Sequence, residues 1–414
     1  MQTTLLTLGI AIILVLVAAL VGPGLIDWEQ YHAELEQQAR QIVGLPVRVR
    51  GAIDVRLLPT PSVTLGDVQI GAADSSRKVS ARGLSMELSL GNLMRGEFRA
   101  NQVTLDRPEV RATLDKSGAL QFPGLAFNFD LDRLAIERLT IVDGQLLLTD
   151  AASGGKLAVE GLNVSGEAGS LLGPYKLEGT FTAGGEHYAY RFASNRRNDD
   201  GSMKVRLGIA SDERALDFQS DGTLWFDAGS PRFEGAAALS PLAGSKDARG
   251  HVILTEQWKV VAGKVKASPS AVQFDQMEMS YGPQARVVRA NGEATLSLGR
   301  DPRLSATVAA RQIDFDRLLP SGDEKRSPFE TVKLLIEELA PAPASRLPVH
   351  VAVGIDSLMA GGAAVSSLHG DIASTADGWT LNRLEMRAPG ATQILVNGKF
   401  TVLADQQKAE FQGP

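Results

Sequence analysis

The chain has 414 residues, no cysteine and a formal net charge of −6, and its basic residues do not cluster. Without cysteine there is no disulfide framework, no thiolate metal site and no cysteine nucleophile. Scattered basic residues give nucleic-acid binding no electrostatic footprint. The 42 glycines and the 6% of aromatic residues are typical of many short strands joined by tight turns, rather than of a helix-rich enzyme.

The first residues predict a membrane anchor. The stretch from Thr3 to Gly22 carries no charged side chain, and roughly 20 apolar residues are needed to cross the hydrocarbon core of a bilayer. We expect residues 1–25 to form one transmembrane helix; a secretory signal cleaved after Ala19 is the alternative. The charged residues that follow are at first acidic, which favours an inside N-terminus. The bulk of the chain is then periplasmic, on a single-pass protein of the bacterial inner (plasma) membrane.

An amphipathic helix is predicted from Trp28 to Val43. Its apolar face repeats at spacings of three and four residues and comprises Trp28, Tyr31, Leu35, Ala39 and Ile42. Gly44 and Pro46 end the helix. This face either packs on the first strands or holds Trp28 and Tyr31 at the lipid interface, where aromatic residues are enriched.

From Val47 to about Asp316 the pattern changes to period two. In one run Leu84, Met86, Leu88 and Leu90 alternate with polar residues, and such alternation gives a strand one apolar and one polar face. The fold class predicted is mostly β, with a long antiparallel sheet that has one solvated face. Turns are predicted at Asp-Gly, Asn-Gly and Gly-Gly pairs, namely residues 143–144, 154–155, 184–185, 221–222, 291–292 and 397–398.

A second break in the pattern lies at residues 321–348, a predicted linker with a short helix near residues 329–339 that an Ala-Pro-Ala-Pro sequence ends. The expected divisions are an anchor (1–25), a β-region with the amphipathic helix (26–320), this linker, and a further β-region (349–414). The last region either ends a short protein or is part of a longer one. Open twisted sheets rarely exceed about 10 strands without curling or splitting. The sheet must therefore fold over as a sandwich or barrel, or curl into a trough filled by an apolar ligand.

Several residues have local structural interpretations. Pro59 and Pro61 lack the amide hydrogen that a β-ladder needs, so we expect them at a strand end or edge. Gly66 is expected to mark a bulge or bend. Asp314 and Asp316 are expected to cap a turn at residues 318–319.

Short stretches that together carry a family resemblance are spread along nearly the whole chain. They are Ile26–Tyr31, Val43–Val47, Gly51–Ile53, Leu57–Val63, Gly66–Ile70, Leu90–Glu97, Val103–Val110, Ser170–Tyr175, Ile313–Leu319, Asp377–Trp379 and Ala388–Thr392. In this order they resemble the AsmA-like family of envelope proteins. The resemblance implies an inner-membrane anchor and a long periplasmic β-sheet curled into a groove, formed here by residues 26–320. It also implies a groove interior that carries phospholipid acyl chains toward the outer membrane, or an influence on outer-membrane protein assembly.

The sequence contains no recognisable catalytic constellation. The histidines, His32, His187, His251, His350 and His369, are never three to five residues apart, so metal ligands would have to converge from distant positions. No serine lies in a GxSxG elbow, and the Gly361-Gly362 pair lacks the GK[ST] of a phosphate loop. Pairs such as Asp130 and Asp132 suit a solvated face. We therefore expect a non-enzymatic protein with no cofactor and no metal.

Two functions stay open at this stage. In the first, the apolar strand face is a groove that carries phospholipid between the inner and outer membranes, and Leu84, Met86, Leu88 and Leu90 line it. In the second, the protein is a structural or assembly factor that influences outer-membrane protein insertion or targeting through protein partners. The expected partners are phospholipid acyl chains, the inner membrane and outer-membrane assembly or lipid-transport proteins, and not nucleic acid.

Overall fold

The structure is a computed structural model that describes residues 20, 28–43, 46–71, 79–95, 99–115, 120–121, 135–151, 154–170, 172–227, 230–242, 258–282, 287–298, 301–314, 316, 347–375, 378–390, 392–403 and 406–412. The predicted anchor, apart from Leu20, and the predicted helix near residues 329–339 lie outside the described residues. Within the described part, no helix is both long and apolar enough to cross a membrane.

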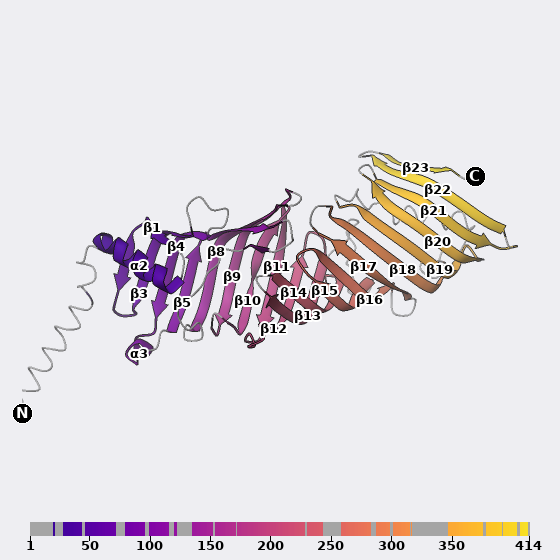
Figure 1. The fold of residues 1–414 in the computed structure, drawn as a ribbon. Helices are drawn as coiled ribbons and strands as arrows, with labels where there is room; N and C mark the ends of the chain where they lie inside the picture. The colour runs from indigo at the N-terminus through magenta and orange to yellow at the C-terminus, as the bar shows by residue number, and fades with distance from the viewer. Residues whose placement is uncertain are drawn as a thin grey trace, which may run out of the picture. The chain divides into compact units, whose positions relative to one another are not determined.

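The fold is mostly β, as predicted, and 23 described strands belong to one sheet. The chain divides into two compact units, the first comprising residues 1–213 and 223–231 and the second residues 214–222 and 232–414. The first unit contains β1 (Val47–Val49), β2 (Ile53–Arg56), β3 (Ser62–Ile70), β4 (Val79–Leu88), β5 (Arg99–Asp106), β6 (Glu109–Leu114), β7 (Leu120–Gln121), β8 (Ala135–Asp150), β9 (Lys156–Ala168), β10 (Tyr175–Ala183), β11 (Glu186–Ser194) and β12 (Ser202–Ser211) (Figure 1).

The second unit contains most of the remaining strands, and the first two of these, β13 (Leu216–Asp227) and β14 (Ser230–Pro241), contribute residues to both units. The others are β15 (Trp258–Ala267), β16 (Ala271–Tyr281), β17 (Val288–Ser297), β18 (Arg303–Asp314), β19 (Val349–Ala360), β20 (Ala363–Thr375), β21 (Gly378–Ala388), β22 (Thr392–Leu403) and β23 (Gln406–Gln412). Helices are short: the 3₁₀ turn η1 (Trp28–Tyr31), α2 (His32–Val43) and α3 (Leu90–Leu93).

The sheet is mixed, which corrects the expectation of a purely antiparallel one. In the first unit, β5 and β6 pair one after the other with β8 in parallel. In the second unit, β18 and β19 are parallel. Parallel neighbours need a crossover of a dozen or more residues. The crossover from β18 to β19 coincides with the predicted linker at residues 321–348, whereas the crossover to β8 was not predicted. The neighbouring strands from β8 to β12 and from β14 to β18 pair antiparallel.

Several predicted turns are wrong because the strands are longer than the turn signals suggested. Residues 143–144, 221–222, 291–292 and 397–398 lie inside β8, β13, β17 and β22. The glycine pairs are hairpin turns as predicted, at 154–155 between β8 and β9 and at 184–185 between β10 and β11. Gly154, Gly184 and Gly185 have positive φ, the conformation that glycine adopts at no steric cost.

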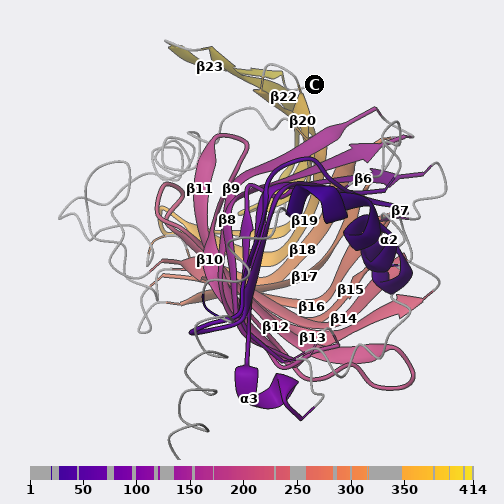
Figure 2. The same ribbon diagram turned by 90° about the vertical axis from the view of Figure 1, so that its left-hand side faces the viewer.

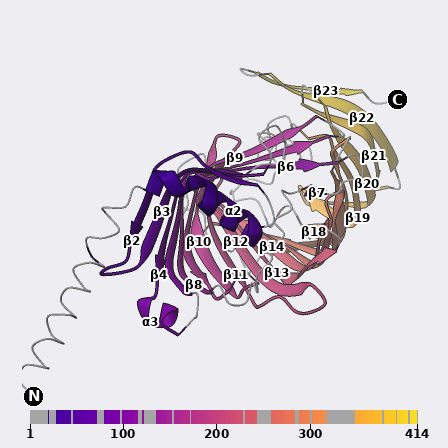
Figure 3. The same cartoon turned by 60° about the vertical axis from the view of Figure 1, so that its left-hand side comes forward.

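The predicted amphipathic helix exists, with its first turn tightened to η1. Trp28 and Ala39 pack on a cluster formed by Val47, Val49, Ile53 and Val68, so Trp28 takes the packing role; Tyr31 is exposed. Helix α2 lies beside the first strands (Figure 3). The amide of Val49 donates to Glu36 Oε1 at 2.8 Å, and its carbonyl accepts from His32 Nδ1 at 3.0 Å.

These two hydrogen bonds cover the outer edge of β1. Its other edge faces β3, where Arg50 N donates to the Asp67 carbonyl and Gly71 N donates to the Pro46 carbonyl. An open strand edge is a template for unwanted pairing. His32 and Glu36, one turn apart on α2, therefore make the hydrogen bonds that a further strand would make at this end of the sheet.

Candidate functional site

Paired residues place a continuous apolar surface on one face of the first unit. Directly opposite residues on neighbouring strands point to the same face of a sheet. One row of such partners reads Val63, Met86, Val103, Leu139, Gly166, Leu177, Phe192 and Leu207. The next row reads Leu65, Leu84, Leu105, Ile141, Val164, Gly179, Tyr190 and Ile209. We call these two rows, from β3 to β12, the apolar strip.

The strip is only partly covered. Val103 and Val164 are buried, whereas the other large apolar members, including Leu177, Tyr190 and Phe192, are of intermediate exposure. Most buried hydrophobic residues of the described chain belong to four small clusters of three or four members each, instead of one continuous core. When two sheets pack face to face, their inner side chains interdigitate into a shared core. The described residues of this unit do not cover the strip in that way.

Aromatic side chains extend the apolar surface beside the strip. Phe181 stacks on Tyr188 with ring centroids 5.1 Å apart and meets Tyr190 at 6.0 Å. Offset stacking of this kind contributes about 0.5–1.5 kcal/mol beyond area burial. Burial raises the pKa of the Tyr190 and Tyr175 phenols, so both stay neutral on this apolar surface.

The opposite face of the same strands is polar. A row of hydroxyl side chains crosses it, formed by Thr64, Ser85, Thr104, Thr140 and Ser165. A shallow hollow on this side has charged lining residues of both signs, among them Glu87, Arg99, Glu137, Arg138 and Lys176. Most of these alternate with strip residues along their strands, so the hollow is not a continuation of the strip.

Three of the four predicted lining residues are on the apolar face. Leu84 and Met86 belong to the strip, and both pack with Leu88 against a buried cluster that includes Ala100 and Val103. The alternation stops earlier than predicted: β4 ends at Leu88, and Leu90 begins α3, where its side chain is 43% exposed. Whether these residues contact lipid stays a prediction.

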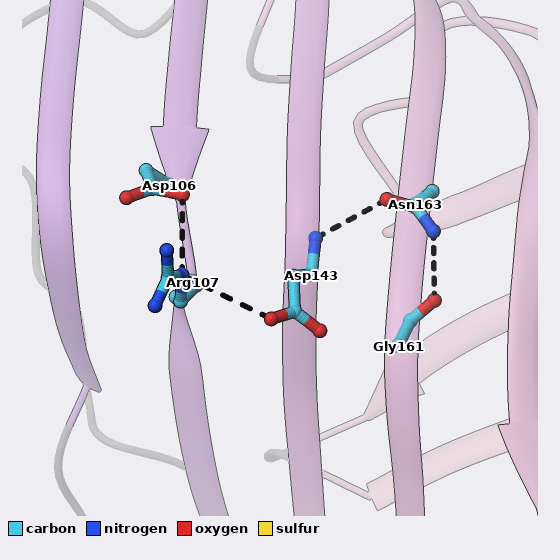
Figure 4. A network of polar contacts seen from close by, with 5 residues as sticks. All are labelled: Asp106, Arg107, Asp143, Gly161 and Asn163. Atoms are coloured by element: carbon cyan, nitrogen blue, oxygen red, sulfur yellow. Dashed lines mark hydrogen bonds and ion pairs between the residues drawn. The ribbon is translucent and has the colours of Figure 1, made fainter.

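A line of strand irregularities crosses the sheet beside the strip (Figure 4). Asp143 in β8 and Gly161 in β9 have left-handed backbone, with φ of 53° and 57°, and so does Arg107 (φ 45°) in the connection between β5 and β6. The Arg107 guanidinium lies 3.7 Å from Asp106 and 3.9 Å from Asp143. The pairing of β8 with β9 shifts register between Ile141 and Gly144, and that of β9 with β10 shifts opposite Thr180 and Thr182. A bulge of this kind bends its strand and increases the local twist, and we call the two neighbouring bulges the crease.

Polar groups stabilise this crease on its exposed side. The Asp143 amide donates to Asn163 Oδ1 at 3.2 Å, and Asn163 Nδ2 donates to the Gly161 carbonyl at 3.0 Å (Figure 4). Asn163 thereby links two of the irregular strands. The Asp143-Gly144 pair, predicted as a turn, supplies the left-handed residue of a bulge instead.

Apolar rows also cross the second unit. One reads Val265, Phe274, Ala294, Ala306, Val351, Ile372 and Leu381. Another reads Ala262, Met277, Gly292, Val308, Val353, Gly370, Leu384 and Val396. Small residues are frequent in these rows, and most members are again of intermediate exposure.

Two of the described histidines form local pairs with carboxylates. His187 Nδ1 lies 3.0 Å from Glu213, and His350 Nε2 lies 3.0 Å from Asp371. The His187 hydrogen bonds lower the pKa of Glu213. Within the described part of the chain, no group of three or more histidine, aspartate or glutamate side chains has the geometry to hold a metal ion. His251 lies outside the described residues.

Two features of the site could not be predicted from the sequence. The strip is defined by strand register, which a single sequence does not reveal because the parallel pairs break the order of neighbours. The turn at residues 318–319 that Asp316 was expected to cap lies outside the described residues; its carboxylate accepts hydrogen bonds from the amides of Gly361 and Gly362 at 2.6 and 2.8 Å. The Gly361-Gly362 pair was the signal available in the sequence for a tight turn there, and both glycines have positive φ.

Comparison with known proteins identifies one family. The model of the AsmA family matches residues 1–170, a range that holds α2, the crease and the strip from β3 to β9. No curated protein and no solved structure matches the chain.

Proposed function

We propose, on the premise that this chain is AsmA-like over residues 1–170, that it is a non-enzymatic protein of envelope biogenesis. Anchored in the inner membrane, with its sheet in the periplasm, it holds phospholipid acyl chains on the apolar strip. Phospholipid then moves between the inner and outer membranes along this surface.

The observation that carries the proposal is the continuity of the strip at intermediate exposure. Eight strands contribute to it, namely β3, β4, β5 and β8 to β12. Neighbouring strands lie about 4.8 Å apart, so seven spacings give a length of about 34 Å. One leaflet of a bilayer core is about 15 Å thick. A fully extended acyl chain therefore fits across the strip with room to move.

Such a surface removes the free-energy cost of exposing the acyl chains to water during transfer. Each CH₂ of an acyl chain contributes about 0.8 kcal/mol when it is buried from water. A chain that slides from one row of apolar partners to the next stays covered at each step. Transfer of this kind makes and breaks no covalent bond, which is why we assign no catalytic residue.

The test is native mass spectrometry of the full chain, released gently from membranes. We expect phospholipid to co-purify with the wild-type protein. The double variant Leu177→Asp with Phe192→Asp places two charges on a cross-strand pair of the strip and should lose most of the lipid. Charged groups on this surface oppose burial of an acyl chain.

The matched control is Thr180→Asp with Ala189→Asp, a pair on the same two strands whose side chains are exposed on the other face. This variant should keep its lipid. A wild-type protein that is folded and free of lipid would overturn the proposal. Crosslinking to protein partners would then test the assembly-factor alternative.

A further inference from the structure

An exposed apolar surface lies at one margin of the first unit, formed by two neighbouring connections. Leu57, in the β2–β3 connection, is 47% exposed, and Leu90 and Met94, in the β4–β5 connection, are 43% and 82% exposed. The Leu88 amide donates to the Pro61 carbonyl at 2.8 Å, which holds the two connections side by side. We call Leu57, Leu90 and Met94 the apolar tip; α3 carries part of it beyond the end of β4 (Figure 2).

The composition of the tip is that of a membrane-contacting segment. Residues 57–61 read LLPTP and residues 90–94 read LGNLM, with no charged side chain in either stretch. An arginine flanks each stretch, Arg56 on one side and Arg95 on the other, and both are exposed. Single exposed apolar residues are ordinary, but apolar side chains next to basic ones are the pattern of segments that lie in the headgroup layer.

Chain length keeps this margin close to the predicted membrane span. Three Cα–Cα steps lead from residue 25, at the end of that span, to Trp28, and three steps reach at most about 11 Å. Trp28 packs on the cluster that contains Ile53 of β2. Strand β2 then runs only four residues to Arg56, or about 13 Å, and the tip follows directly.

We propose that the apolar tip inserts into the headgroup layer of the membrane that holds the anchor. Leu57, Leu90 and Met94 enter the boundary of the acyl chains, and Arg56 and Arg95 contact lipid phosphates. Basic residues next to a membrane are attracted to the negative surface potential of its anionic lipids. The partner is thus a bilayer with anionic lipid, and not a protein.

The absence of cysteine in the chain makes the test direct. The variant Met94→Cys, labelled with an environment-sensitive nitrobenzoxadiazole dye, is reconstituted as the full chain in vesicles of phosphatidylethanolamine and phosphatidylglycerol. We expect blue-shifted emission and strong quenching by lipids that carry a shallow nitroxide. Leu57→Cys should give the same result from the other connection.

The matched control is Leu157→Cys. Leu157 is an apolar strand residue of the same unit and is 54% exposed. It lies at one end of β9, and Ala168 lies at the other end, on the same side of the sheet as the apolar tip. Eleven residues of strand place it roughly 36 Å away, so its label should report water and resist quenching. If the labels at positions 94 and 57 show the same emission and the same weak quenching as the label at position 157, membrane insertion is overturned. This outcome includes the case in which the tip binds a protein instead of the bilayer. Lipid co-purification by the same labelled protein is scored separately, so failure of the tip contact is distinguishable from failure of the lipid-carrying function.

Discussion

At the scale of single residues, Asp371 shows how a carboxylate on the polar face is held. It accepts a hydrogen bond from Asn382 Nδ2 at 2.8 Å and faces His350 Nε2. The Asn382 hydrogen bond is the main cause that lowers the pKa of Asp371; burial acts in the opposite direction, and His350 adds a further lowering. These contacts link β19, β20 and β21 on the polar face, so we expect them to contribute to the stability of this surface.

This pKa shift predicts the pH dependence of an Asn382→Ala variant. A carboxylate whose pKa is lower in the folded than in the unfolded chain stabilises the fold above its ordinary value near 3.8. That contribution is lost as pH falls through the lowered pKa. The difference in melting temperature between wild type and variant should be constant above about pH 5 and shrink below pH 4. A difference that is independent of pH down to pH 2 would contradict the assignment, and Asp356→Ala, an exposed aspartate on β19, is the control.

At the scale of elements, the bend between β1 and β2 depends on two glycines that face one another. A Cβ on Gly51 would lie 2.6 Å from the backbone carbon of Gly66. Gly51 N donates to the Gly66 carbonyl at 3.0 Å, and Gly66 N donates to the Ala52 carbonyl at 2.9 Å. The expected bend at Gly66 is confirmed, and it lets β1 and β2 pair in succession with the single strand β3.

The close approach predicts an asymmetric result for two glycine-to-alanine changes. Gly51→Ala should lower the free energy of unfolding by about 1–3 kcal/mol, because the methyl group meets backbone that cannot rotate away. Gly91→Ala, where nothing lies within 4 Å of the new methyl group, should be neutral or slightly stabilising. Denaturant unfolding of both variants measures the two values. Equal changes in the free energy of unfolding for the two variants would contradict the close contact between Gly51 and Gly66.

Elements also explain which predictions failed. The sequence predicted period-two strands correctly because each strand has one apolar face, and Pro59 and Pro61 lie between β2 and β3 as expected. The Asp-Gly pair at residues 143–144 predicts a hairpin, but a left-handed residue serves a bulge as well as a turn, and Asp143 has this role inside β8. The pairs inside β13, β17 and β22 have no left-handed residue and continue their strands. The hydrogen bonds of Asp316 could not be predicted for a different reason, since these partners are 45 and 46 residues away.

At the scale of the whole molecule, composition and alternation sufficed for the β class and for one apolar face. They could not supply the register that joins Leu84 to Leu105 and then to Ile141, because β5 and β8 are parallel neighbours separated by a crossover. The path of the strip across the strands therefore depends on strand pairing, whereas its apolar character can be predicted from the sequence. The edge cover by His32 and Glu36 is likewise a tertiary feature that helix periodicity did not reveal.

The most direct test of the account is site-specific photocrosslinking in bacterial cells that produce the full chain. A photoreactive phenylalanine replaces Leu177 on the strip or its neighbour Glu178, which is exposed on the opposite face of β10. The account predicts phospholipid adducts, identified by mass spectrometry, from position 177 and not from position 178. Equal labelling at both positions, or protein adducts alone from position 177, would contradict the claim that the apolar strip holds lipid.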